Sequence, residues 1–136
     1  MEYTERYVTK FYDNLAEGKL VGQKCNQCHG YQPFPSPWCR HCQSTDLQYV
    51  DFSMKGKLIY VGVAHFAEER FMKSGLYPLA MGAVQCEEGP MVYIPVLEGI
   101  DVKNIPEANM RCPLDVVIET REIGGNYIPV ARVVKP

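Results

Sequence analysis

Long hydrophobic runs are missing from this chain of 136 residues. Nowhere do about 18 apolar residues follow one another, so no transmembrane helix is expected. The first 19 residues are charged throughout and lack the apolar centre of a signal peptide. An excess of either charge is missing too. The net charge of -2 and the pI near 5.9 give no general attraction to nucleic acid or anionic lipid. We expect a cytoplasmic protein.

Familiar catalytic motifs are also absent. The sequence contains no Walker loop, no G-x-G-x-x-G, no G-x-S-x-G and no H-E-x-x-H. Only three histidines are available as partners for the thiols of Cys86 and Cys112, which we interpret as ordinary reduced cysteines. The acidic residues form no compelling carboxylate pair. We therefore do not expect the chain to carry out covalent chemistry by itself.

The first 18 residues have the pattern of an amphipathic helix. Tyr3, Tyr7, Phe11 and Leu15 recur every four residues and form an apolar stripe. Gly18 is a plausible helix stop. Such an aromatic stripe could pack on the chain's own body or dock onto a partner, and the sequence leaves both readings open.

Four of the six cysteines form two close pairs, Cys25 with Cys28 and Cys39 with Cys42. Two C-x-x-C turns can place four thiolates at the corners of a tetrahedron, which is the geometry of a structural Zn²⁺ site. Iron would also accept four thiolates. A redox C-x-x-C is less favoured because the βαβ context is missing, and a catalytic zinc would need an open coordination position. We expect a structural zinc.

The segment between the cysteine pairs reads YQPFPSPW, with three alternating prolines that exclude a helix. A module of about 25 residues buries too little apolar surface to fold alone, so we expect the metal to substitute for a core. The metal would then hold Phe34 and Trp38 in fixed positions. These rings either cover the module's own flank or contact a partner.

The remainder of the chain is rich in β-branched and aromatic residues. Turn signals at EEG (87–89) and GGN (124–126) separate the candidate strands. Five short strands with one long connection, residues 67–78, favour a small closed barrel of the oligonucleotide/oligosaccharide-binding (OB) type. The expected strands are 56–66, 79–86, 91–99, 114–123 and 126–134. The predicted fold is mainly β: an N-terminal amphipathic helix (1–18), a rubredoxin-like zinc ribbon (19–47) and a five-stranded OB-fold barrel (48–136).

Several motifs together resemble those of a known family. FYDNLAEGKL fits F-x-x-x-L-x-x-G-x-L and is followed by CNQCHGYQPFPSPWCRHCQS, the strand GKLIYVGVAH and the hairpin PLAMGAVQCEEG. Over essentially its whole length the chain resembles the acyl-CoA-associated zinc-ribbon/OB-fold family, once catalogued as a domain of unknown function. Two departures stand out: His29 occupies the place of the usual glycine, and CRHC lacks the common proline. Neither removes a metal ligand.

The resemblance implies a non-catalytic accessory subunit. Members of that family assemble with thiolase-superfamily proteins, or with aldolases and hydratases acting on CoA thioesters, and help form the acyl-CoA channel. It implies a thiolase-type partner, a hetero-oligomer, and coenzyme A or acyl-CoA as a shared ligand. An aromatic or dicarboxylic acyl-CoA, as in anaerobic toluene breakdown, is a candidate substrate. Cations and apolar side chains suited to CoA are Lys24, Arg40, Phe66, Arg70, Phe71, Lys73 and Tyr77; candidate partner contacts are Tyr3, Tyr7, Phe11, Phe34 and Trp38.

Two other functions stay open. Zinc-ribbon/OB proteins can bind single-stranded nucleic acid by aromatic stacking in a positively charged groove, although the overall acidity of this chain argues against it. A rubredoxin-like electron carrier would hold iron on the same four cysteines and would be coloured.

Overall fold

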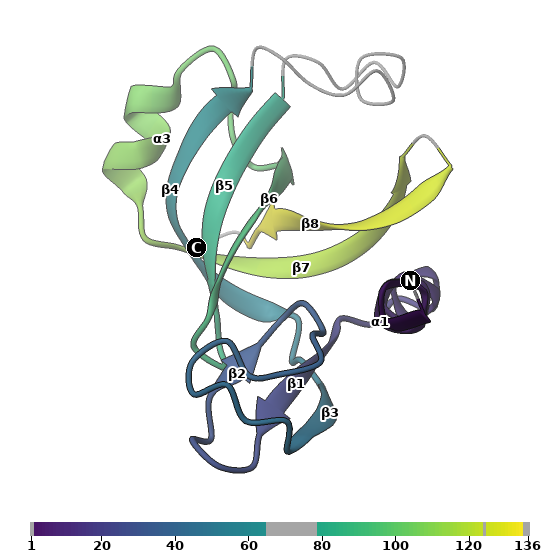
Figure 1. The fold of residues 1–136 in the computed structure, drawn as a ribbon. Helices are drawn as coiled ribbons and strands as arrows, with labels where there is room; N and C mark the ends of the chain where they lie inside the picture. The colour runs from purple at the N-terminus through teal and green to yellow at the C-terminus, as the bar shows by residue number, and fades with distance from the viewer. Residues whose placement is uncertain (1, 65–78, 124, 135–136) are drawn as a thin grey trace.

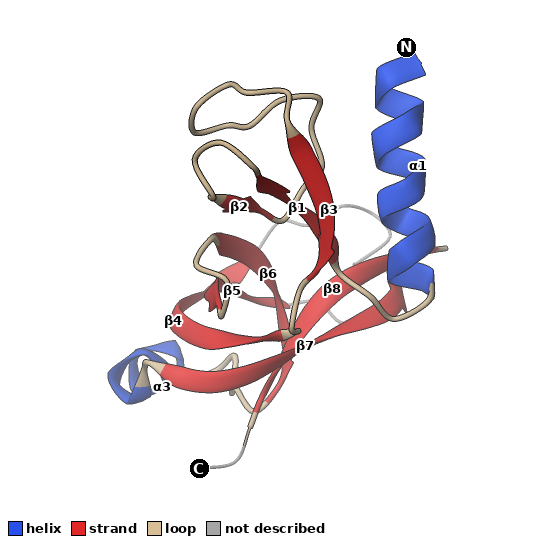
Figure 2. Ribbon diagram, turned by 90° about the horizontal axis from the view of Figure 1, so that it is seen from below, coloured by secondary structure: helices blue, strands red, loops and turns tan. Residues whose placement is uncertain are grey.

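The structure, a computed structural model, describes residues 2–64, 79–123 and 125–134. Strand is the commonest secondary structure among these residues. One helix precedes a small three-stranded sheet, and a larger five-stranded sheet follows (Figure 1). Figure 2 shows the helix alongside the small sheet and near strands β7 (Leu114–Ile123) and β8 (Asn126–Val133) of the large one. The mainly β fold class predicted from the sequence is confirmed.

Helix α1 spans Glu2–Ala16, and Gly18 caps its C-terminal end, as the sequence predicts. Gly18 has a φ of +83°, which glycine adopts without steric cost. The N–H of Gly18 donates to the carbonyl of Leu15 at 3.0 Å, and the N–H of Lys19 donates to that of Asn14 at 3.0 Å. These two bonds form a Schellman cap. On the apolar stripe, Phe11 and Leu15 are buried within the chain itself.

The ribbon sheet consists of β1 (Val21–Cys25), β2 (Tyr31–Gln32) and β3 (Leu47–Asp51). Its order is β2-β1-β3, and both pairs are antiparallel. The ribbon sheet therefore extends to Asp51. Directly after it, the N–H of Phe52 donates to the carbonyl of Leu20 at 2.9 Å and ties the two ends of the ribbon together.

The larger sheet closes on itself in the order β4-β5-β6-β8-β7, with β7 paired back to β4. Pairing is antiparallel except between β6 and β8, which run parallel. Helix α3 (Ile105–Arg111) lies between β6 and β7 in the chain and packs against β4. This connectivity is that of the five-stranded barrel expected from the sequence. The strands are β4 (Lys55–Ala64), β5 (Leu79–Cys86), β6 (Met91–Glu98), β7 (Leu114–Ile123) and β8 (Asn126–Val133).

Helix, ribbon and closed sheet share one hydrophobic core. Phe11 and Leu15 from α1 join Leu20 and Phe52 from the two ends of the ribbon. Burial of large apolar side chains is the main stabilising term in folding, so the three parts stabilise one another. The closed sheet contributes the remaining large side chains of this core, among them Leu58, Val61, Val84, Val92, Ile94, Val96, Val116 and Ile118.

Within the described residues, neither helix is long and apolar enough to cross a lipid bilayer.

Candidate metal centre and ribbon loop

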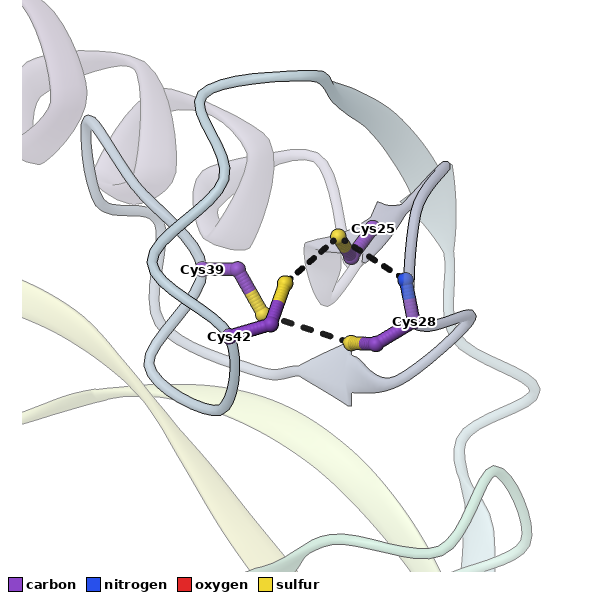
Figure 3. A group of neighbouring side chains, drawn as sticks. All are labelled: Cys25, Cys28, Cys39 and Cys42. Atoms are coloured by element: carbon purple, nitrogen blue, oxygen red, sulfur yellow. Dashed lines mark hydrogen bonds between the residues drawn. The ribbon is translucent and has the colours of Figure 1, made fainter.

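The four cysteines predicted as metal ligands converge on one point (Figure 3). Their sulfurs all lie within 4.8 Å of one another. Cys25 Sγ is 3.5 Å from Cys42 Sγ, and Cys28 Sγ is 3.6 Å from Cys39 Sγ. A Zn–S bond of about 2.3 Å places the sulfurs of a tetrahedral site roughly 3.8 Å apart. The spacing therefore fits a four-thiolate metal centre.

Each cysteine pair forms the same turn around its first sulfur. The backbone N–H of Gln27 points at Cys25 Sγ at 3.3 Å, and that of His41 points at Cys39 Sγ at 3.4 Å. A thiolate accepts such bonds better than a neutral thiol does. The two turns are thus shaped to hold charged sulfur.

A backbone hydrogen bond closes each turn, from the residue four positions after the first cysteine back to that cysteine. The N–H of His29 donates to the carbonyl of Cys25 at 3.0 Å, and the N–H of Gln43 donates to that of Cys39 at 2.9 Å. Both donors have left-handed backbone, with φ of +63° at His29 and +66° at Gln43. Left-handed backbone is where non-glycine residues are disfavoured. The chain therefore accepts local strain at both turns to bring the second cysteine of each pair into place.

The thiols of the centre differ in acidity. The Cys28 N–H, helped by the Gln27 N–H and neighbouring thiols, donates to Cys25 and lowers the pKa of Cys25 to about 6 despite burial. At Cys28 the Gly30 N–H has the same lowering effect. However, desolvation and the crowded neighbouring sulfurs outweigh it and raise the pKa of Cys28 to about 11. Four adjacent thiolates repel one another, so complete ionisation needs a cation at their centre.

Zinc fits this donor set. Four soft sulfur donors in tetrahedral spacing suit Zn²⁺ held by Cys25, Cys28, Cys39 and Cys42. With four protein ligands, a bound zinc would have no open position for water or substrate, so its role would be to cross-link the two turns. Cys25 and Cys39 are buried beneath the centre, while Cys28 and Cys42 face solvent.

A pair of buried glutamines, not predicted from the sequence, also holds the loop between the cysteine pairs. Gln23 and Gln32 face each other across β1 and β2, and each is nearly fully buried. Gln32 Nε2 donates to Gln23 Oε1 at 2.7 Å. Glutamine is usually a surface residue, and no spacing rule signals such a pair. Only the pairing of β1 with β2 places Gln23 opposite Gln32.

The two amides fix the backbone of the loop at three residues. Gln23 donates to the carbonyl of Ser36 at 3.0 Å and accepts from its N–H at 2.9 Å. Gln32 donates to the carbonyl of Trp38 at 3.2 Å and accepts from the N–H of Arg40 at 3.0 Å. The polar groups of this loop are thus satisfied without regular secondary structure. We refer to these two residues as the glutamine clamp.

The clamp leaves two aromatic rings of the loop at the surface. The exposed fraction is 39% for Phe34 and 52% for Trp38. Phe34 stacks edge-on against Phe11 of α1, with ring centroids 5.5 Å apart. Arg40 is exposed nearby in the chain, and the ammonium of Lys24 lies 5.5 Å from the ring centroid of Tyr31. The predicted contact Phe11 is buried, so the exposed aromatic side chains of the loop between the cysteine pairs are Phe34 and Trp38.

The other predicted site residues lie elsewhere. Phe66, Arg70, Phe71, Lys73 and Tyr77 fall outside the described residues. Tyr3 and Tyr7 lie in α1, but the structure describes only their backbone.

The two remaining thiols are poor nucleophiles. Burial and the nearby Glu88 carboxylate raise the pKa of Cys86 to about 11. Burial likewise raises the pKa of Cys112, in spite of Arg111. A thiol needs a lowered pKa to be reactive near neutral pH. Both cysteines therefore behave as packing residues.

Comparison with known proteins supports the zinc ribbon. Residues 13–48 match the family model of the "ChsH2, rubredoxin-like zinc ribbon domain". A relative from Pyrococcus furiosus, a "DUF35 domain-containing scaffold protein", is 32% identical over 118 residues, covering 85% of this chain and 79% of the relative.

Two solved structures share the fold. The "Ltp2-ChsH2(DUF35) aldolase" matches with a TM-score of 0.72 and 25% identity over 94% of each chain. A DUF35 protein of unknown function from Sulfolobus solfataricus matches with a TM-score of 0.58 and 13% identity, covering 98% of this chain and 89% of the other. The four-cysteine ribbon, the closed sheet and these similarities agree, and the chain belongs to the DUF35 family.

Proposed function

We propose that this chain is a non-catalytic, zinc-containing subunit that docks a thiolase-type enzyme acting on acyl-CoA. The observation that carries the proposal is the ribbon loop. A metal centre and the glutamine clamp hold Trp38 and Phe34 in place at the surface. Fixing the backbone that carries large exposed aromatic rings is of little use to an isolated chain but favours tight protein association. The proposal includes a cytoplasmic location.

The charge of the ribbon indicates what its partner surface offers. Between Gly18 and Asp46 the sequence has no acidic residue, whereas Lys19, Lys24 and Arg40 are cationic. The matching surface is an apolar pocket with an acidic rim, because interfaces pair opposite potentials.

The family assignment supports an accessory role. One relative is described as a scaffold protein and one similar structure as an aldolase with a DUF35 component. The thiolase type rests on the sequence resemblance. An aldolase acting on a CoA thioester is the second candidate, favoured by the description of that similar structure. In either complex, Lys24 and Arg40 with Arg70 and Lys73 would meet the phosphates of coenzyme A, and an aromatic or dicarboxylic acyl group is the proposed substrate class.

The test is to purify the tagged full-length chain from its own cells and to identify stoichiometric partners by native mass spectrometry. The complex should catalyse thiolysis or aldol cleavage of an acyl-CoA, and the chain alone should not. Trp38→Ala combined with Phe34→Ala should weaken assembly at least tenfold, whereas Tyr127→Ala, at an exposed aromatic of β8, should not.

Other outcomes would contradict the proposal. A chain that emerges alone, or with RNA or single-stranded DNA, would indicate an independent binding module. A red-brown protein containing iron would indicate an electron carrier.

A further inference from the structure

The outer face of the closed sheet carries a second group of exposed apolar side chains. The exposed fraction is 49% for Tyr60 and 64% for Tyr93, with Met91 at 40% and Ile59 at 36%. Tyr60 on β4 and Tyr93 on β6 both pair with Ala83 of β5, so they lie in one cross-strand row. We refer to Ile59, Tyr60, Met91 and Tyr93 as the tyrosine face. Exposed apolar clusters on single chains often mark interaction sites.

A β-bulge creates part of this face. The register of β4 against β5 shifts between Leu58 and Tyr60, which makes Ile59 an extra residue. Leu58 and Val61 point into the core, being fully and almost fully buried, whereas the two residues between them are exposed. In a regular strand one of two neighbouring residues would point inward. The bulge thus turns two consecutive large side chains outward.

Helix α3 braces the strand just after the bulge. The N–H of Val61 donates to Asn109 Oδ1 at 2.9 Å, and Asn109 Nδ2 donates to the carbonyl of Val61 at 2.9 Å. One side chain thereby replaces both hydrogen bonds of a neighbouring strand. The bulge is held from its open edge, so the outward side chains sit on a fixed backbone.

The two tyrosines also fix each other. The hydroxyl of Tyr60 donates to the hydroxyl of Tyr93 at 2.9 Å, and the rings meet edge-on with centroids 6.2 Å apart. Ala83, between them in the row, has no exposed surface. Because little side-chain freedom is left to lose, a partner binding here would meet a low entropic cost.

Among the described residues, the rows that form this face carry almost no charge. Three adjacent rows of paired residues cross β4, β5 and β6 on this side, and Lys57 is the one charged residue in them. Its ammonium is already paired with Asp115 at 3.0 Å. Nucleic acid and the phosphates of CoA need available cations, so this face suits neither. Tyrosine and methionine on an uncharged surface are typical of the centre of protein interfaces. The rows are Lys57–Gln85–Met91, Tyr60–Ala83–Tyr93 and Gly62–Met81–Pro95.

We propose that the tyrosine face docks a protein subunit of the enzyme complex through an uncharged, apolar surface of that subunit. This inference rests on the proposed function and extends it. The chain would contact its complex at two places of different chemistry, the cationic ribbon loop and the neutral tyrosine face. Two separate contacts are what a scaffold requires in order to hold subunits in a fixed arrangement.

Site-specific photo-crosslinking in the purified complex tests this directly. p-Benzoylphenylalanine would replace Tyr93 in one sample, Trp38 in a second and Tyr127 in a third as the control. We expect crosslinks to an enzyme subunit from positions 93 and 38 and none from 127, with the crosslinked peptides identified by mass spectrometry. Tyr93→Glu should weaken assembly at least tenfold, and Tyr127→Glu should not. Unchanged thermal melting and zinc content would show that both variants fold.

The outcomes separate the two proposals. A crosslink from 38 without one from 93 would overturn the tyrosine-face proposal and leave the proposed function standing. If neither position crosslinks to an enzyme subunit, both proposals fail. A crosslink from 93 to a second copy of this chain, or to RNA, would also overturn docking of an enzyme subunit here.

Discussion

His29 and Gln43 each follow the second cysteine of a pair and each hold left-handed backbone. The sequence already marks His29 as standing where the family has glycine. Gly30 does not take over that role. It lies outside the left-handed range, and an added Cβ would be 2.9 Å from His41 Cδ2. Gly30 is therefore required for close packing of the two turns, and the strain stays at His29.

Replacing His29 with glycine should stabilise the protein. Glycine removes the steric cost of a φ of +63°, and after its greater loss of chain entropy the net gain should be about 0.5–1 kcal/mol. Urea unfolding of the zinc-loaded protein measures the change. Gln27→Gly, in the same turn but without left-handed backbone, should destabilise. If both variants lose stability, strain at His29 is not the explanation.

At the scale of elements, the ribbon loop depends on hydrogen bonds from the two strands beside it. Gln23→Leu keeps most of the side-chain volume but leaves the N–H and the carbonyl of Ser36 without hydrogen-bond partners. Each buried polar group without a partner costs about 1–3 kcal/mol, so we expect a loss of about 2–4 kcal/mol. Gln48→Leu, on the exposed side of β3, should change stability by less than about 0.5 kcal/mol.

Hydrogen exchange gives the clamp a readout beyond stability. In the native state the N–H of Ser36 donates to Gln23 Oε1 and the N–H of Arg40 donates to Gln32 Oε1. Both amides should therefore be protected from exchange. In Gln23→Leu they should exchange faster even where the closed sheet remains protected. Unchanged exchange at Ser36 would mean that the metal centre alone orders the loop.

Elements with a strong local pattern were predictable, and those without one were not. The strands of the closed sheet follow the expected ranges because β-branched residues and turn signals mark them. The ribbon strands are short and lack alternation, and β1 is buried at nearly every position, so only their pairing reveals them. Helix α3 has seven residues with proline in its first turn, which is too short for an apolar stripe. The cysteine cluster was predictable because ligand spacing is itself the signal.

For the whole molecule, the shared core links the metal to the closed sheet. Leu20 and Phe52 belong to the ends of the ribbon yet lie in the same cluster as Leu58 and Val84. Tyr31 of the ribbon contacts the Phe52 ring, with centroids 6.1 Å apart. The ribbon therefore cannot come apart without exposing one side of the barrel core. Most side chains of this shared core, however, come from the barrel, and their packing needs no metal.

Removing the metal should unfold the ribbon first and weaken the rest. Binding of structural zinc contributes about 10–16 kcal/mol in zinc-finger peptides at neutral pH, and a contribution of this kind is one that the segment 21–51 cannot replace by burial. We expect one zinc per chain by elemental analysis. After treatment with a strong chelator, amide protection should disappear over 21–51 and persist in β4–β8, while the melting temperature of the remaining structure falls. Cys28→Ser should reproduce this state, and Cys112→Ser, at a thiol outside the centre, should not. Protection that persists over 21–51 in the metal-free chain would show that the glutamine clamp and the shared core suffice, and the zinc would then need a role other than holding the loop.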